Sequence, residues 1–179
     1  MSKLKMMVLS LLAAFVASAG SDFKAGFARV DVTPPMGIPM PGYFSKRLAD
    51  KVVDPLVAEC VAFSWNDQAG LVFSVDNLHL REELCLRANA MIEKELGIPG
   101  SRQFINATHT HTGGETQVRK SHTAEEAAIV EAYADMVVKR LVEAAKAAMA
   151  DLAPATLSVG NTECRGISFI RRFRMKAMG

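Results

Sequence analysis

The segment Thr108–Glu115 (THTHTGGE) combines the residue types that are most able to do chemistry in this chain. It holds two of the four histidines, His109 and His111, at alternate positions after the apolar run 104–107. If that run is a strand, side chains two residues apart share a face, so both imidazoles would point the same way at its end. Imidazole is the commonest metal ligand and titrates near neutral pH. The pair predicts a metal-activated water or an acid–base group, the alternative being two hydrogen-bonded loop histidines.

The other side chains that could bind a metal or take part in catalysis are scattered along the sequence. His79 lies close to Asp76 and could be functional, but surface or structural roles are favoured for both His79 and His122. The three cysteines are widely spaced without a Cys-x-x-Cys pair, so neither a disulfide framework nor a cysteine zinc site is indicated.

The N-terminal residues have the pattern of a targeting signal. Lys3 and Lys5 precede the apolar stretch 6–16, and Ala17-Ser18-Ala19 forms a small-residue cleavage site. We therefore expect a signal peptide at 1–19, a mature chain from 20 to 179 and a secreted or periplasmic location; the alternative is an uncleaved anchor. Without the two signal lysines, 19 basic residues face 19 acidic ones. This balance gives no indication of a nucleic-acid partner.

The hydrophobic pattern predicts a mixed α/β (α+β) protein with mixed sheets flanked by helices. Expected strands are 25–32, 57–65, 71–75, 103–108 and 155–160, and expected helices are 81–96 and 124–150. A capping box at Thr123–Glu126 marks the start of the longer helix. The long irregular segment 38–55 is typical of a lid or a substrate wall.

Four segments in this order resemble the N-terminal part of the catalytic domain of the neutral/alkaline, non-lysosomal ceramidases. They are Thr33–Gly37, Asp76, Ala107–Gly113 and Ser168–Arg174. The resemblance runs from about residue 26 to the last residue, and the THTH segment is its most specific motif. The chain departs from the family pattern at Gly114, where the family often has proline, and at Ile170, where relatives commonly have asparagine.

The resemblance implies a Zn²⁺-dependent amidase that hydrolyses the N-acyl bond of ceramide to sphingosine and a fatty acid. It implies that His109 is a zinc ligand and that His111 lies beside the metal-bound water and the substrate. It also places Arg171 near the substrate amide, with Arg172 one position away. Zinc lowers the pKa of its bound water to about 7. A free imidazole could orient that water or protonate the leaving amine, and a guanidinium could stabilise the oxyanion.

The ligand set in this chain is short of what that chemistry needs. Catalytic zinc takes about three protein ligands, whereas the resemblance assigns only His109. We therefore expect a truncated catalytic domain that is inactive alone, with an edge strand or a core face left uncovered. The expected partner is a sphingolipid or another N-acyl substrate, which could be met at a membrane surface. Two alternatives stay open: a related metallohydrolase acting on another amide or ester, and a catalytically silent fragment or binding module.

Overall fold

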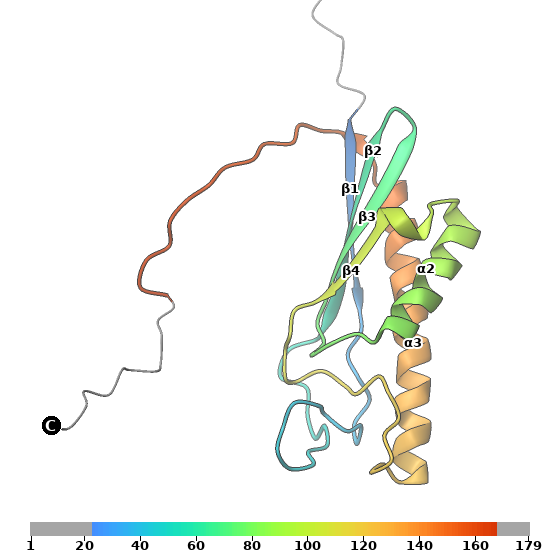
Figure 1. Ribbon diagram of the computed structural model, residues 1–179, viewed down its shortest axis with the longest axis vertical. Helices are drawn as coiled ribbons and strands as arrows, with labels where there is room; N and C mark the ends of the chain where they lie inside the picture. Colours follow the sequence, from blue (N-terminus) through green and yellow to red (C-terminus); the bar gives the residue numbers. More distant parts are fainter. Residues whose placement is uncertain (1–22, 168–179) are drawn as a thin grey trace, which may run out of the picture.

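The computed structural model describes residues 23–167, so the expected signal segment 1–19 and Arg171 lie outside the described residues. The chain forms a mixed α/β unit around a five-stranded sheet, which confirms the expected fold class (Figure 1). Its elements in chain order are β1 (Lys24–Asp31), β2 (Val57–Trp65), β3 (Gln68–Val75), α2 (Glu82–Leu96), the 3-10 turn η1 (Gly100–Arg102), β4 (Gln103–Ala107), α3 (Ala124–Ala150) and β5 (Ala153–Pro154).

The sheet has the strand order β4-β3-β2-β1-β5, and its connections explain its mixed directions. β2 and β3 are antiparallel and joined by Asn66 and Asp67, whose φ angles of 48° and 60° suit a two-residue type I′ turn. This tight turn starts β3 at Gln68, earlier than the expected residue 71. β3 and β4 are parallel, because α2 carries the chain back between them.

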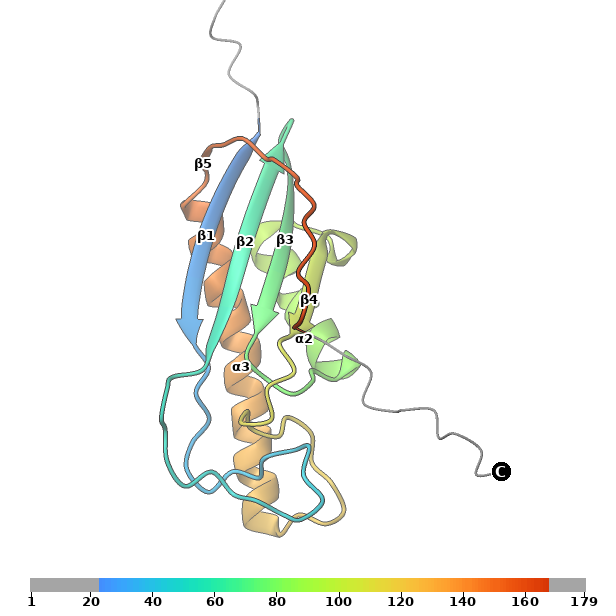
Figure 2. The ribbon, with the colours of Figure 1, turned by 90° about the vertical axis from the view of Figure 1, so that its left-hand side faces the viewer.

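Both helices cover the same face of the sheet (Figures 1 and 2). α3 packs on β1 and β2, and α2 packs against α3. The expected capping box is present: the backbone N–H of Glu126 donates to the Thr123 hydroxyl, and the backbone N–H of Thr123 donates to the Glu126 carboxylate. The end of α3 lies so close to β1 that a Cβ on Gly26 would be 2.1 Å from the carbonyl oxygen of Ala148. Among the described residues, no helix is long and apolar enough to cross a membrane.

The opposite face of the sheet carries an apolar row that the described residues leave uncovered. Phe27 pairs with Val61, Val61 with Val72, and Val72 with Phe104, so the row crosses β1 to β4. Both phenylalanines are at least half exposed. The strands thus alternate between a buried helix-facing side and this open side, which faces the viewer in Figure 2.

The expected strand at 155–160 is wrong. β5 is limited to Ala153–Pro154, and the segment that follows has no regular secondary structure. Leu157 and Val159 alternate as strand residues do, but both are exposed. The physical reason is that the pairing reaches the beginning of β1: Pro154 pairs with Lys24, its first residue, and Ala155 still donates its backbone N–H to the carbonyl oxygen of Phe23 at 3.1 Å. Beyond Ala155 the chain leaves the sheet (Figure 1), so Leu157 and Val159 have no strand to pair with among the described residues. Alternation without a strand to pair with does not form a sheet.

Candidate functional site

The candidate site begins where the two parallel strands end. Val75 of β3 pairs with Ala107 of β4, so the residues that follow them, Asp76 and Thr108, lie side by side. The Thr108 hydroxyl donates to Asp76 Oδ1 at 3.0 Å, and the other carboxylate oxygen accepts the backbone N–H of Val57 at 3.1 Å. Asp76, one of the four segments of the ceramidase resemblance, therefore connects the end of β3 with the end of β4 and the beginning of β2. Ligands of open α/β sheets commonly bind at this carboxyl edge.

His109 lies just beyond the end of β4 in a left-handed conformation, with φ of 65°. Non-glycine residues adopt such angles rarely, and those that do cluster at functional sites. Its Nδ1 lies 3.0 Å from the carbonyl oxygen of Leu78. Because a carbonyl can only accept, Nδ1 carries the proton in this bond. The lone pair of the neutral ring is then on Nε2, as a metal ligand requires.

His111 is held in the same way by a different part of the chain. Its Nδ1 donates to the carbonyl oxygen of Gly42 at 3.1 Å, which again leaves the Nε2 lone pair free. Gly42 has φ of 92°, and a Cβ there would lie 2.5 Å from His111 Nδ1. The ring of Tyr43 meets the imidazole edge-on, with 5.9 Å between ring centroids. A residue with a side chain at position 42 would displace His111.

The two imidazoles lie together, with ring centroids 5.3 Å apart and planes at 77°. The rings are therefore neighbours, but the expected reason, a shared face of one strand, is wrong. β4 ends at Ala107, so strand alternation does not extend to the pair. The left-handed turn at His109 and the two carbonyl contacts set the arrangement instead. The roles of zinc ligand for His109 and proton-transfer group for His111 stay predictions.

The two glycines after the histidines serve close packing. A Cβ on Gly113 would lie 3.0 Å from the Cα of Asn77, and one on Gly114 would lie 2.8 Å from the ring of Tyr133. The buried Asn77 side chain donates to the carbonyl oxygen of Gly114 at 3.1 Å. The departure from the family pattern at Gly114 thus coincides with tight packing between the histidine loop and α3.

Glu115 is a buried carboxylate to which the sequence analysis assigned no role. Its side chain is 2% exposed and forms an ion pair with Arg119. The backbone N–H groups of Thr116 and Gln117 also donate to it, at 3.2 and 3.3 Å. The backbone N–H of Glu115 donates to the carbonyl oxygen of Pro39. Glu115 therefore fixes the histidine loop against the irregular segment, and no spacing pattern in the sequence marks it.

The two remaining histidines differ in environment. His79 Nε2 is buried without a hydrogen-bond partner among the described residues. Burial, followed by the charge of Arg81, lowers the pKa of His79. His122 Nδ1 accepts the backbone N–H of Arg119 at 3.2 Å and so closes a turn before α3. This contact agrees with a structural role for His122.

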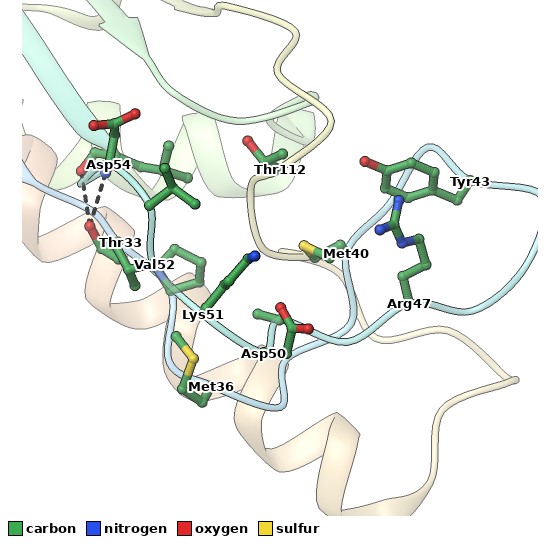
Figure 3. A pocket seen from close by; sticks show the side chains of 14 residues that line it. Thr33, Met36, Met40, Tyr43, Arg47, Asp50, Lys51, Val52, Asp54 and Thr112 are labelled. Carbon is green, nitrogen blue, oxygen red and sulfur yellow. Dashed lines mark hydrogen bonds between the residues drawn. The ribbon is translucent and has the colours of Figure 1, made fainter.

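A cavity of about 440 Å³ lies beside His111 and has the irregular segment as its wall (Figure 3). Thr112 and Tyr43, which flank or contact His111, also line it. Its other lining residues are Thr33, Pro34, Met36, Met40, Arg47, Ala49, Asp50, Lys51, Val52, Val53, Asp54 and Leu56. The volume is in the range of small-molecule sites. The segment expected to act as a substrate wall is thus in position to do so.

The donor set fits part of a zinc site. The Nδ1 contacts of His109 and His111 leave Nε2 of each ring as the atom that could bind zinc, which is the chemistry that zinc needs from imidazole. Within residues 23–167, however, no three His, Cys, Asp or Glu side chains are grouped so that they could hold a metal ion. The expected oxyanion partner Arg171 lies outside these residues.

The fold is similar to that of two solved ceramidase chains. A neutral ceramidase from Pseudomonas aeruginosa matches with a TM-score of 0.62, and a ceramidase complexed with C2 matches with a TM-score of 0.64, both at 20% identity. Each match covers 75% of this chain and 22% of the solved chain. No protein-family model and no curated protein matches the sequence. The chain therefore has the fold of a segment of neutral ceramidase, as the THTH resemblance predicted.

Proposed function

We propose that this chain is part of an exported, zinc-dependent amide hydrolase that cleaves the N-acyl bond of ceramide or a close relative. The observation that carries the proposal is the histidine pair. Both rings are fixed through Nδ1 to backbone carbonyls and present Nε2 at the carboxyl edge of β3 and β4. The ceramidase-like fold and the adjoining cavity support a lipid amide as substrate, and the targeting pattern of residues 1–19 supports export.

The two histidines have different tasks in this proposal. His109 would hold the zinc ion, which supplies Lewis acidity and a bound water with a pKa of about 7. His111 would take a proton from the attacking water at Nε2 and deliver it to the leaving amine. The Gly42 carbonyl keeps the His111 ring in the required tautomer. Arg171 would face the developing oxyanion. Further zinc ligands would come from polypeptide outside the described residues.

The test is a pair of substitutions in the protein expressed from its complete gene. His109→Ala should remove both bound zinc and hydrolysis of N-acyl sphingosine. His111→Ala should retain most of the zinc and lose about 10²–10⁴-fold in rate, the range for removing a general acid–base group. His122→Ala is the matched control and should change neither. Equal zinc loss in the His109 and His111 variants would show that the pair chelates together.

A catalytically silent binding module is the second candidate, because the described residues hold no three-ligand group. Under the main proposal, the 179-residue chain alone should retain no stoichiometric zinc after dialysis, since most of the binding energy comes from several fixed ligands. Stoichiometric zinc in this chain would contradict the need for further ligands. Zinc-independent binding of N-acyl sphingosine, without hydrolysis by the complete gene product, would favour the binding module.

A further inference from the structure

The irregular segment contains an ordered hairpin, residues 38–49, whose tip projects at one end of the molecule. An isolated bridge joins Pro39 to Leu48. Three backbone hydrogen bonds hold the two arms together, from the N–H groups of Gly37, Met40 and Ala49 to the carbonyls of Ala49, Arg47 and Ile38. The tip is thus a built structure, and it lies beyond the sheet, next to the start of α3 (Figure 1).

The tip of this hairpin exposes large apolar side chains. Phe44 is fully exposed, and no other large apolar residue among those described is as open to solvent. Tyr43 and Leu48 on either side of it are also exposed. Ordering a loop so that it presents a bare phenylalanine to water is unfavourable unless a partner covers it, because apolar area in contact with water raises the free energy.

The charges on the hairpin point to the nature of that partner. The hairpin carries Lys46 and Arg47 and no carboxylate. Lys46 is anchored to the Glu126 carboxylate at the start of α3, with N–O distances of 2.7 and 2.8 Å. The Arg47 guanidinium lies 4.4 Å from the centroid of the Tyr43 ring and forms no ion pair within residues 23–167. An exposed aromatic beside an amphipathic tyrosine and a cation without an ion pair is typical of protein surfaces at a lipid interface.

The hairpin tip is also connected directly to the candidate site. Gly42, next to Tyr43, supplies the carbonyl that holds His111. Tyr43, Arg47 and Met40 line the cavity beside Thr112, as Figure 3 shows. A surface that meets the tip therefore lies next to both the cavity and the imidazole.

We propose that the hairpin 38–49 docks the protein on a lipid bilayer. In this arrangement Phe44 inserts among the acyl chains, while Tyr43 and Arg47 lie at the level of the headgroups. An N-acyl lipid can then pass from the bilayer into the cavity without crossing bulk water. Only the identity of this lipid rests on the proposed function. Docking itself depends on the exposed tip and can be measured without hydrolysis.

The experiment uses the expected mature chain, residues 20–179, because the apolar stretch 6–16 could itself bind vesicles. It carries Phe44→Trp in a Trp65→Phe background, which leaves one tryptophan, at the tip. With phosphatidylcholine vesicles its emission should shift to the blue, and lipids brominated in the acyl chain should quench it. In a sedimentation assay, Phe44→Ser should weaken vesicle binding roughly 10- to 100-fold, as expected for losing one buried aromatic. Arg47→Gln should weaken binding about fivefold, and only when phosphatidylserine is included.

Phe104→Ser is the matched control, because Phe104 is 62% exposed but lies on the open face of the sheet, away from the hairpin. It should leave vesicle binding unchanged. Equal loss in both serine variants would overturn the proposal in favour of docking through the sheet. Absence of vesicle binding would also overturn the proposal. So would a chain that only self-associates with rising concentration, if Phe44→Ser abolishes that self-association and no vesicle binding is seen. Vesicle binding by a hydrolytically inactive complete protein would sustain this inference while contradicting the proposed function.

Discussion

A single added carbon at Gly42 should disturb His111 while leaving the rest of the site in place. Gly42 has φ of 92°, and a Cβ there would lie 2.5 Å from Nδ1 and 2.8 Å from Cε1 of His111. Both distances are far below ordinary contact. Gly42→Ala must therefore move the imidazole or the hairpin and break the 3.1 Å bond from Nδ1 to the Gly42 carbonyl.

The expected magnitude has two parts. Forcing a residue with a side chain into this region costs about 1–3 kcal/mol of backbone strain. Losing the hydrogen bond costs about 1 kcal/mol more. Gly37→Ala separates the two, because Gly37 has φ of 80° but no atom within 4 Å of its added Cβ. We expect a loss of unfolding free energy of about 2–4 kcal/mol for Gly42→Ala and about 1–3 kcal/mol for Gly37→Ala.

Urea unfolding gives the two stabilities, and long-range ¹H–¹⁵N NMR reports on the four imidazoles individually. In Gly42→Ala the His111 nitrogen shifts should lose the signature of a fixed Nδ1–H tautomer, while His79 and His122 stay unchanged. In Gly37→Ala all four should keep their native shifts. Identical stability losses in the two variants, with native His111 shifts in both, would refute the claim that Gly42 positions this ring.

Three further outcomes follow from the packing. Burial, followed by Arg81, lowers the pKa of His79 below 6.5, so the unfolded chain takes up this proton first as pH falls. The stability contributed by neutral His79 should be complete above about pH 6.5 and decline below it. The urea midpoint of unfolding should therefore fall between pH 7.5 and pH 5.5, and it should fall less in His79→Gln than in the unsubstituted protein. An equal fall in both proteins would show that His79 is not the origin of the pH dependence. Maleimide should label exposed Cys164 in the native protein, whereas Cys60, which is buried and has its pKa raised to about 12, should react only after unfolding. Peptide mass spectrometry distinguishes the two, and native labelling of Cys60 would contradict its place in the core. In Gly26→Ala the added Cβ would lie 2.1 Å from a carbonyl oxygen of α3, so the free energy of unfolding should fall by about 3 kcal/mol, the upper end for overpacking. An unchanged midpoint of thermal unfolding would show that α3 can shift freely.

The sequence determined the parts of this protein that depend on neighbouring residues. Alternating apolar positions set β1 and β2, and helical spacing set α2 and α3, because one buried face per element is a local property of the chain. The capping box at Thr123 likewise marked the start of α3 with residues inside a single turn. The same local reasoning failed at 155–160, where Leu157 and Val159 alternate but have no strand to pair with between residues 23 and 167.

The histidine motif was equally visible in the sequence, since His109 and His111 are two residues apart and follow a run that predicts a strand. Only the tertiary structure decided how they are arranged. The carbonyls of Leu78 and Gly42, 31 and 69 residues away along the chain, fix the two rings and their tautomers. The left-handed backbone at His109, rather than strand alternation, brings the rings together. Long-range contacts of this kind leave no periodic trace in the sequence, because each depends on where the folded sheet places the ends of separate elements.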